Sequence, residues 1–161
     1  HRRIALLAGP AAGWTAPLQL AGYRGQLARL GIAFNPRLVR IGPSRPDHAA
    51  ASLTALLALA EPPGAVIAGD PAMALGAIGA MAEAKLRYPR DLSLLCLEDA
   101  DWMAPLGLGA ASWSPDRIAA TAVGLLFERI ARPTAPIRRA TIAAALDPRR
   151  SCARPVAAGR G

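Results

Sequence analysis

The stretch AVIAGDPAMALGAIGAMAEA, residues 65–84, decides the fold. It opens with a short apolar run, reaches a Gly-Asp-Pro joint and continues into a longer apolar segment. Aspartate before proline is typical of a helix start, because the carboxylate accepts from free backbone N–H groups and proline suits the first helical position. The stretch predicts a strand, then a helix from Pro71 to Leu86, with Asp70 between them as a cap, a catalyst or a ligand contact.

Three further apolar runs alternate with segments of helical period. The runs cover residues 4–8, 38–41 and 92–97, and the helical segments cover residues 16–32, 47–64 (ending in Pro-Pro-Gly) and 116–131. Most of the runs are continuous rather than alternating, which is typical of strands covered on both faces of a parallel sheet. The order predicts an α/β fold, a doubly wound parallel sheet with right-handed crossovers.

This fold class indicates where a ligand binds. Open parallel sheets bind ligands beyond the carboxyl ends of their strands. Applied to this chain, the rule selects residues 9–15, 42–45, 69–70 and 98–102. Asp70 therefore lies on the functional edge even if its role is only to cap a helix.

Composition favours one folded domain without export signals. The chain has 161 residues, 53% of them hydrophobic, which allows a real core. No apolar run reaches the roughly 18 residues that cross a bilayer, so we expect no membrane contact. The two cysteines, Cys96 and Cys152, have no metal or disulfide spacing, and a reducing cytoplasm is expected. Because residue 1 is histidine and a strand follows almost at once, we expect a piece of a longer protein.

The formal charge of +8 raises the question of nucleic-acid binding. The arginines are scattered along the chain, and Lys85 is the only lysine. A scattered pattern does not indicate a basic face, so we do not assign direct nucleic-acid binding to this chain.

Acidic residues follow the fourth run. Glu98, Asp99 and Asp101, together with Asp70, could form a cluster for a metal or for phosphoryl transfer. The loop after the first run, AGPAAGWT, lacks the acidic partners of such a site. We therefore expect Asp99 and Asp101 to be solvated, and we assign no metal site.

Other catalytic patterns are missing from the sequence. It has two histidines far apart, no G-x-S-x-G motif, no Walker A loop and no dinucleotide fingerprint. Cys96 lies within an apolar run, where an inert thiol is expected. We expect neither a cofactor nor an enzyme activity.

The helix beginning at Pro71 has no charged or polar side chain between residues 72 and 82. A helix that is apolar all round needs a second covering surface besides the sheet. We predict a subunit interface formed by Met73, Leu75, Ile78 and Met81. Burial within a single larger domain is the alternative.

The segments HRRIALLAGP, LAGYRGQLARLGI and the block from Pro62 to Trp102 resemble the effector-binding domain of LacI/GalR-type transcriptional regulators, which are relatives of type 1 periplasmic binding proteins. The resemblance covers about residues 1–150 and implies the C-terminal lobe of a two-lobed domain, truncated at its N-terminus. It implies that residues 1–112 form this lobe and that residues 113–137 are a crossover and helix belonging to the N-terminal lobe. Residues 138–161 would be a final strand and a disordered tail.

The resemblance also implies a repressor that acts as a cytoplasmic homodimer. It would respond to a sugar-like or nucleoside-like small molecule and reach operator DNA only through a helix-turn-helix outside this chain. Candidate effector contacts carried over by position, or added as aromatic stacking partners, are Thr15, Gln19, Asp70, Glu98, Trp14 and Trp102.

Two of these positions depart from the family pattern. Gln19 stands where the family has arginine, and Glu98 stands where it has aspartate. Without the arginine, the pocket lacks the paired, charged N–H donors of a guanidinium. The pocket therefore either binds a different ligand or has lost its ligand.

Two other classes of protein stay open. A periplasmic solute-binding protein shares this fold but has a secretory signal in place of the helix-turn-helix. An enzyme would use Asp70 and Glu98 as an acid/base pair across a cleft.

Overall fold

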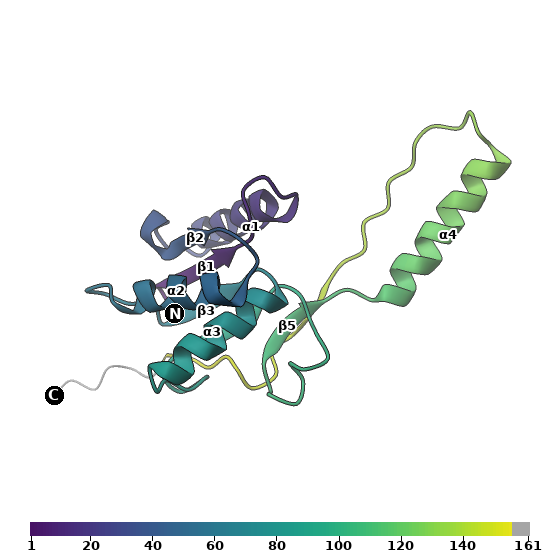
Figure 1. The fold of residues 1–161 in the computed structure, drawn as a ribbon. Helices are drawn as coiled ribbons and strands as arrows, with labels where there is room; N and C mark the ends of the chain where they lie inside the picture. The colour runs from purple at the N-terminus through teal and green to yellow at the C-terminus, as the bar shows by residue number, and fades with distance from the viewer. Residues whose placement is uncertain (156–161) are drawn as a thin grey trace.

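The computed structural model describes residues 1–155 and confirms the predicted fold class. One six-stranded sheet has the order β2-β1-β3-β4-β5-β6 (Figure 1). Its strands are β1 (Ile4–Ala8), β2 (Val39–Ile41), β3 (Ala65–Ala68), β4 (Ser93–Cys96), β5 (Gly109–Ser112) and β6 (Ala145–Asp147). The helices are α1 (Thr15–Arg29), the short 3-10 helix η1 (Pro36–Leu38), α2 (Pro46–Leu57), α3 (Pro71–Glu83) and α4 (Pro115–Ala131).

The first five strands in this order are parallel. Ile4 pairs with Ala65 and Ala65 with Ser93, so β1, β3 and β4 start level and end at the same edge. The sheet departs from the purely parallel prediction at β6, which pairs antiparallel with β5. β5 was not predicted, because its short sequence GAAS offers only small side chains and no apolar run.

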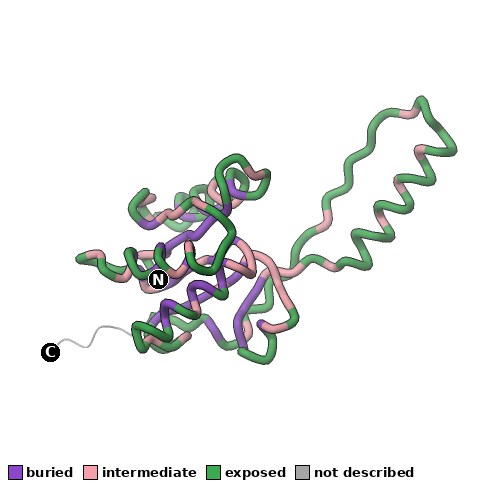
Figure 2. The backbone as a smooth tube through the Cα atoms, in the orientation of Figure 1, coloured by how far each residue is buried: buried purple, intermediate pink, exposed green. Residues whose placement is uncertain are grey.

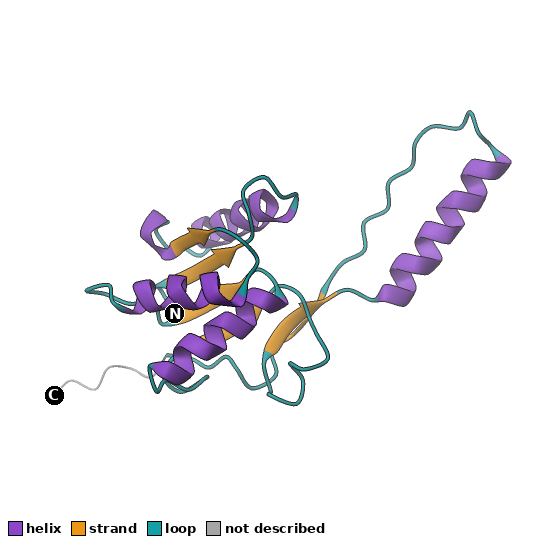
Figure 3. Ribbon diagram, viewed as in Figure 1, coloured by secondary structure: helices purple, strands orange, loops and turns teal. Residues whose placement is uncertain are grey.

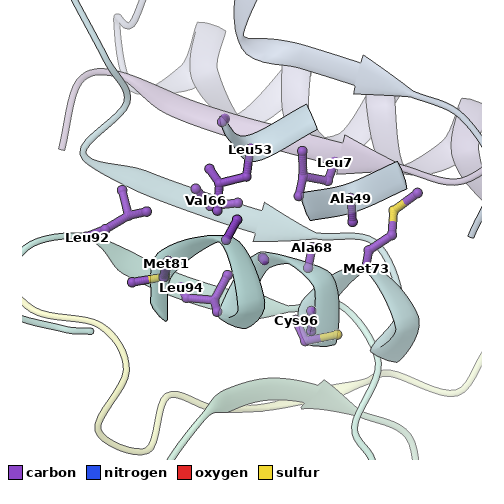
Figure 4. Packing of buried hydrophobic residues seen from close by; sticks show 14 of the residues in the cluster. Leu7, Ala49, Leu53, Val66, Ala68, Met73, Met81, Leu92, Leu94 and Cys96 are labelled. Atoms are coloured by element: carbon purple, nitrogen blue, oxygen red, sulfur yellow. The ribbon is translucent and has the colours of Figure 1, made fainter. Parts of the chain in front are cut away.

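Helices cover both faces of the sheet (Figure 3). Helix α1 buries Ala16, Tyr23 and Leu27 on one face, and the Tyr23 hydroxyl donates to the Ile4 carbonyl oxygen at 2.7 Å. Helices α2 and α3 cover the other face over the main core (Figure 4). The largest side chains of that core include Leu7, Leu53, Leu56, Val66, Met73, Met81, Leu92 and Leu94.

Helix α2 provides the second covering surface that the apolar helix α3 needs besides the sheet. Gly76 lies against α2 so closely that a Cβ there would stand 2.1 Å from the Pro46 carbonyl oxygen. Met73 and Met81 are only 1% and 2% exposed, so they fill this chain's own core. Their prediction as subunit contacts was wrong, because an intramolecular helix covers the face that they occupy.

Helix α4 projects from the sheet between β5 and β6, and none of its residues is buried (Figures 1 and 2). Its exposed apolar side chains are Ile118, Val123, Leu126, Phe127 and Ile130. No residue of this helix is buried against another part of residues 1–155.

The segment after β6 is ordered through residue 155, contrary to the predicted disorder. Ser151 is fully buried, and its hydroxyl donates to the Leu94 carbonyl oxygen and accepts from the Gly109 N–H at 2.7 Å. The segment thus joins β4 to β5 at their amino-terminal side. Residues 156–161, the remainder of the predicted tail, lie outside the described residues.

Two features are absent from the described residues, a membrane-spanning helix and a metal-binding cluster. No helix within residues 1–155 has both the length and the apolar character needed to cross a bilayer. The same part of the chain holds no group of three or more His, Cys, Asp or Glu side chains placed to bind a metal ion.

Candidate functional site

Asp70 lies between β3 and α3, and its two carboxylate oxygens have different partners. Oδ1 accepts from the Met73 N–H at 2.9 Å, which caps α3 as the sequence predicts. Oδ2 accepts from the Ser44 hydroxyl at 2.6 Å. Since a carboxylate has about four lone-pair positions, both oxygens keep capacity for a further donor.

Gln19 reaches the same strand end from α1. Its Nε2 donates to the Gly69 carbonyl oxygen at 2.8 Å, and its Oε1 is buried with no hydrogen-bond partner in the described part of the chain. A Cβ on residue 69 would stand 2.7 Å from this oxygen and 2.9 Å from the Leu7 carbonyl oxygen, so the close approach requires glycine. Helix α1 is therefore joined to the end of β3 immediately before Asp70.

Thr15 and Trp14 stand at the start of α1. Thr15 is exposed, and Trp14 is 90% exposed with no side-chain hydrogen bond capping the helix. Trp102 differs, because it is half-buried and packs against the main core. Of the two predicted stacking partners, only Trp14 presents an open indole face.

Glu98 follows β4 and is half-buried. Ala68 pairs with Cys96 across β3 and β4, so Asp70 and Glu98 each stand two residues beyond paired strand ends. Burial, with repulsion from Asp70 and Glu98, raises the pKa of the Cys96 thiol from 9.0 to about 12. The two carboxylates thus stand at neighbouring strand ends, and the raised pKa keeps the Cys96 thiol protonated.

Asp99 is held by an arginine, in contrast to the solvated loop that we predicted. The Arg149 Nη1 and Nη2 groups donate to the two Asp99 carboxylate oxygens at 3.0 and 2.5 Å. The Arg149 side chain is only 15% exposed, and these contacts raise its pKa above the usual value. Sequence reasoning missed this pair because 50 residues separate its members and Arg149 lay in the predicted tail. Asp101 is exposed, as expected.

The cavities along the strand ends are separate. One of about 450 Å³ is lined by Glu98, Asp99, Ala100, Asp101, Ala104, Ser112, Trp113, Pro115 and Arg149. A shallower one of about 320 Å³ is lined by Ala12, Gly13, Trp14, Pro17 and Leu18. The predicted residues therefore share one edge of the sheet but do not line a single cavity. Trp113 and Arg149 are members that the sequence did not indicate.

Comparison with known proteins gives the family. A model of the periplasmic binding protein-like domain matches residues 1–152. The chain is 33% identical over 132 residues to the HTH-type transcriptional repressor PurR of Pasteurella multocida, a match that spans 81% of this chain and 40% of that protein. It is 31% identical over 137 residues to the ribose operon repressor of Escherichia coli, over 83% of this chain and 41% of that protein.

A solved structure agrees with these relatives. The chain superposes on a sugar-binding transcriptional regulator of the LacI family from Escherichia coli, in complex with phosphate, with a TM-score of 0.82 and 26% identity. That match covers 96% of this chain and 56% of the solved one. The chain belongs to the LacI/GalR family, as part of its effector-binding domain. Both curated relatives are named as repressors, and the solved relative as a transcriptional regulator.

The LacI/GalR domain described here spans about 40% of the length of the curated relatives that it matches. Its helix α4 also carries a cavity of about 700 Å³, shared with residues 132–138 and remote from the strand ends. This third cavity is lined by apolar and charged side chains of α4 and of residues 132–138, and none of the predicted effector contacts lines it.

Proposed function

We propose that this chain is the effector-sensing lobe of a bacterial DNA-binding repressor. The observation that carries the proposal is the meeting of Gln19, Asp70 and Glu98 at the carboxyl edge of three parallel strands. Gln19 donates to the Gly69 carbonyl oxygen, and Asp70 and Glu98 each stand two residues beyond the paired Ala68 and Cys96. Ligands of open parallel sheets bind at this edge.

The effector is a small molecule rich in hydroxyl or N–H donors, sugar-like or nucleoside-like. Asp70 and Glu98 accept from it, Thr15 and Gln19 add polar contacts, and the exposed Trp14 offers a stacking surface. Trp102 supports the Glu98 loop from its core side. The relatives are named as repressors, so we assign no enzyme activity and place the protein in the cytoplasm with its DNA.

The whole regulator has two lobes and acts as a homodimer. Residues 1–112 form the C-terminal lobe, and the unburied α4 packs on the N-terminal lobe, with residues 113–137 as the crossover. Leu75, which is 50% exposed, and the half-buried Ile78 lie on the uncovered side of α3 and contact the second subunit. Operator DNA is bound by a helix-turn-helix outside this chain.

Thermal denaturation of the complete protein tests effector binding. The probes are D-ribose, cellobiose and adenosine, each added at millimolar concentration. A ligand at 100 times its dissociation constant stabilises the folded state by about 2.7 kcal/mol, which is easily measured. We expect at least one probe to raise the melting temperature and to change operator affinity measured by fluorescence anisotropy.

Matched variants locate the site. Glu98→Gln keeps the size of the side chain but removes its charge, and we expect it to abolish most of the shift. Glu61→Gln is the control, because Glu61 pairs with Arg3 at 3.0 Å, on the loop before β3 and away from the strand ends. Equal shifts in both variants, or no shift with any probe, would contradict the proposal.

Sedimentation of the complete protein tests the dimer. We expect a dimer at micromolar concentration and a monomer after Leu75→Asp, because burying an unpaired carboxylate in an interface is costly. A wild-type protein that sediments as a monomer would rule out this arrangement.

A further inference from the structure

Arg149 is the most heavily bonded cation in the described part of the chain, and the proposed effector contacts do not include it. It follows β6, at a backbone φ of +40° that residues other than glycine seldom adopt. Its guanidinium lies against the loop that carries Glu98, and both residues line the cavity of about 450 Å³.

The donors of Arg149 are almost fully used by the protein. Nη1 donates to an Asp99 oxygen at 3.0 Å and to the Leu108 carbonyl oxygen at 2.7 Å, and Nη2 donates to the second Asp99 oxygen. Nε donates to Asp147 at 3.2 Å. A guanidinium has five N–H donors, so four are engaged and at most one is free for a ligand. This usage argues against a direct effector contact.

The four bonds join three separate parts of the fold. Asp99 belongs to the loop after β4, next to Glu98, and Leu108 stands immediately before β5. Asp147 ends β6, the strand through which the chain returns from the α4 excursion. Strands β5 and β6 are the two connections between the sheet and α4 (Figure 1).

We propose that Arg149 is a positioning residue that holds the Glu98 loop through Asp99 and couples it to the two strands leading to α4. A bidentate arginine–carboxylate pair fixes orientation as well as distance, which a single hydrogen bond does not. The same arginine therefore positions the Glu98 loop and contacts both the residue before β5 and the last residue of β6, so that a movement of one strand against the other changes the position of the loop. The consequence of this coupling for effector binding rests on the proposed function.

Hydrogen exchange of the complete protein tests the coupling without a ligand. The variants are Arg149→Met and Asp99→Asn, which remove the pair from either side. Each is expected to raise amide exchange in residues 97–104 and 145–151 by about tenfold, the loss from one charge-assisted pair. Exchange in β1 and β3 stays unchanged. The double variant exchanges like either single one, since both remove the same interaction.

Two further variants separate positioning from general stability. Arg138→Met is the control, because Arg138 pairs with Glu128 on the α4 excursion and touches no part of the Glu98 loop. It leaves exchange in residues 97–104 at the wild-type rate. Arg149→Lys keeps the positive charge but cannot form the bidentate pair, so we expect it to keep only part of the protection that Arg149→Met loses. If Arg149→Met does not fold, Asp99→Asn, whose side chain is partly exposed, decides the question alone.

Binding of D-ribose and cellobiose by the same variants separates this proposal from the proposed function. If the wild type binds a probe, Arg149→Met weakens the affinity about tenfold while Arg138→Met does not. If the wild type binds neither of these sugars nor adenosine, only the sensing role is contradicted, and the exchange rates still test the coupling. Unchanged exchange in residues 97–104, or a uniform rise that includes β1 and β3, would overturn the role of Arg149.

Discussion

Replacing Asp70 separates its role as a helix cap from its role in binding. Asp70→Ala removes the bond from the Met73 N–H at 2.9 Å and the bond from Ser44 at 2.6 Å. Loss of an aspartate cap costs about 1 kcal/mol, within a range of roughly 0.5–2. The Ser44 hydroxyl is exposed and regains water, so its bond adds at most about 1 kcal/mol. The free energy of unfolding should fall by about 1–2 kcal/mol.

Asp70→Asn gives the contrast. Asparagine caps helices as well as aspartate, and the extended backbone of residue 70, with φ −155° and ψ 169°, suits both. We expect a cost below about 0.5 kcal/mol. Ser44→Ala isolates the second bond and is expected to cost less than Asp70→Ala.

Urea denaturation followed by circular dichroism measures these differences, and effector affinity of the complete protein is measured beside it. The reasoning requires Asp70→Asn to lose effector affinity while keeping stability. Equal destabilisation by alanine and asparagine would refute the cap, and full affinity in Asp70→Asn would refute the ligand contact.

Three other predictions test packing, the C-terminal segment and pH dependence. Gly76→Ala should destabilise the protein by at least about 1–3 kcal/mol, because its Cβ would meet the Pro46 carbonyl oxygen at 2.1 Å. Gly79→Ala on the same helix meets nothing within 4 Å and should stabilise by up to about 1 kcal/mol; a similar effect of both in urea denaturation would contradict the α2–α3 packing. Ser151→Ala leaves the Gly109 N–H without its partner and leaves the Leu94 carbonyl oxygen with only the Cys152 thiol at 3.5 Å, so calorimetry should show a loss of about 1–3 kcal/mol; an unchanged melting temperature would show that the segment is not anchored there. Because the folded-state pKa of Cys96 is about 12 against 9.0 for a free thiol, the unfolded state loses its proton first and stability falls as pH rises from 9.0 to about 12; Cys96→Ala should flatten this fall in urea titrations, and an identical slope would contradict the assignment.

The sequence predicted the strands whose apolar runs are bounded by turn or helix-start residues. The runs at residues 4–8 and 65–68 coincide with β1 and β3, and the Asp70 cap was found because Asp-Pro has a local physical meaning. Strand β5 was not predicted, since its side chains are small and its place in the sheet depends on neighbours distant in sequence.

The site shows the same division between local and long-range information. Glu98 follows β4 closely, so the strand-end rule selected its loop. Gln19 lies within α1, outside the selected loops, and was found only through the family resemblance. The pair of Asp99 with Arg149 needed the chain to return through β6 after α4, which no local pattern reports. The two methionines of α3 were misassigned for a similar reason, because the covering helix α2 cannot be recognised from the composition of α3 alone.

Hydrogen exchange of the complete protein with and without a bound effector tests the central claim most directly. The account predicts protection of residues 12–20, 69–73 and 97–102, the segments that meet at the carboxyl edge of the sheet. Protection confined to α4 and residues 132–138, around the cavity remote from that edge, would contradict it.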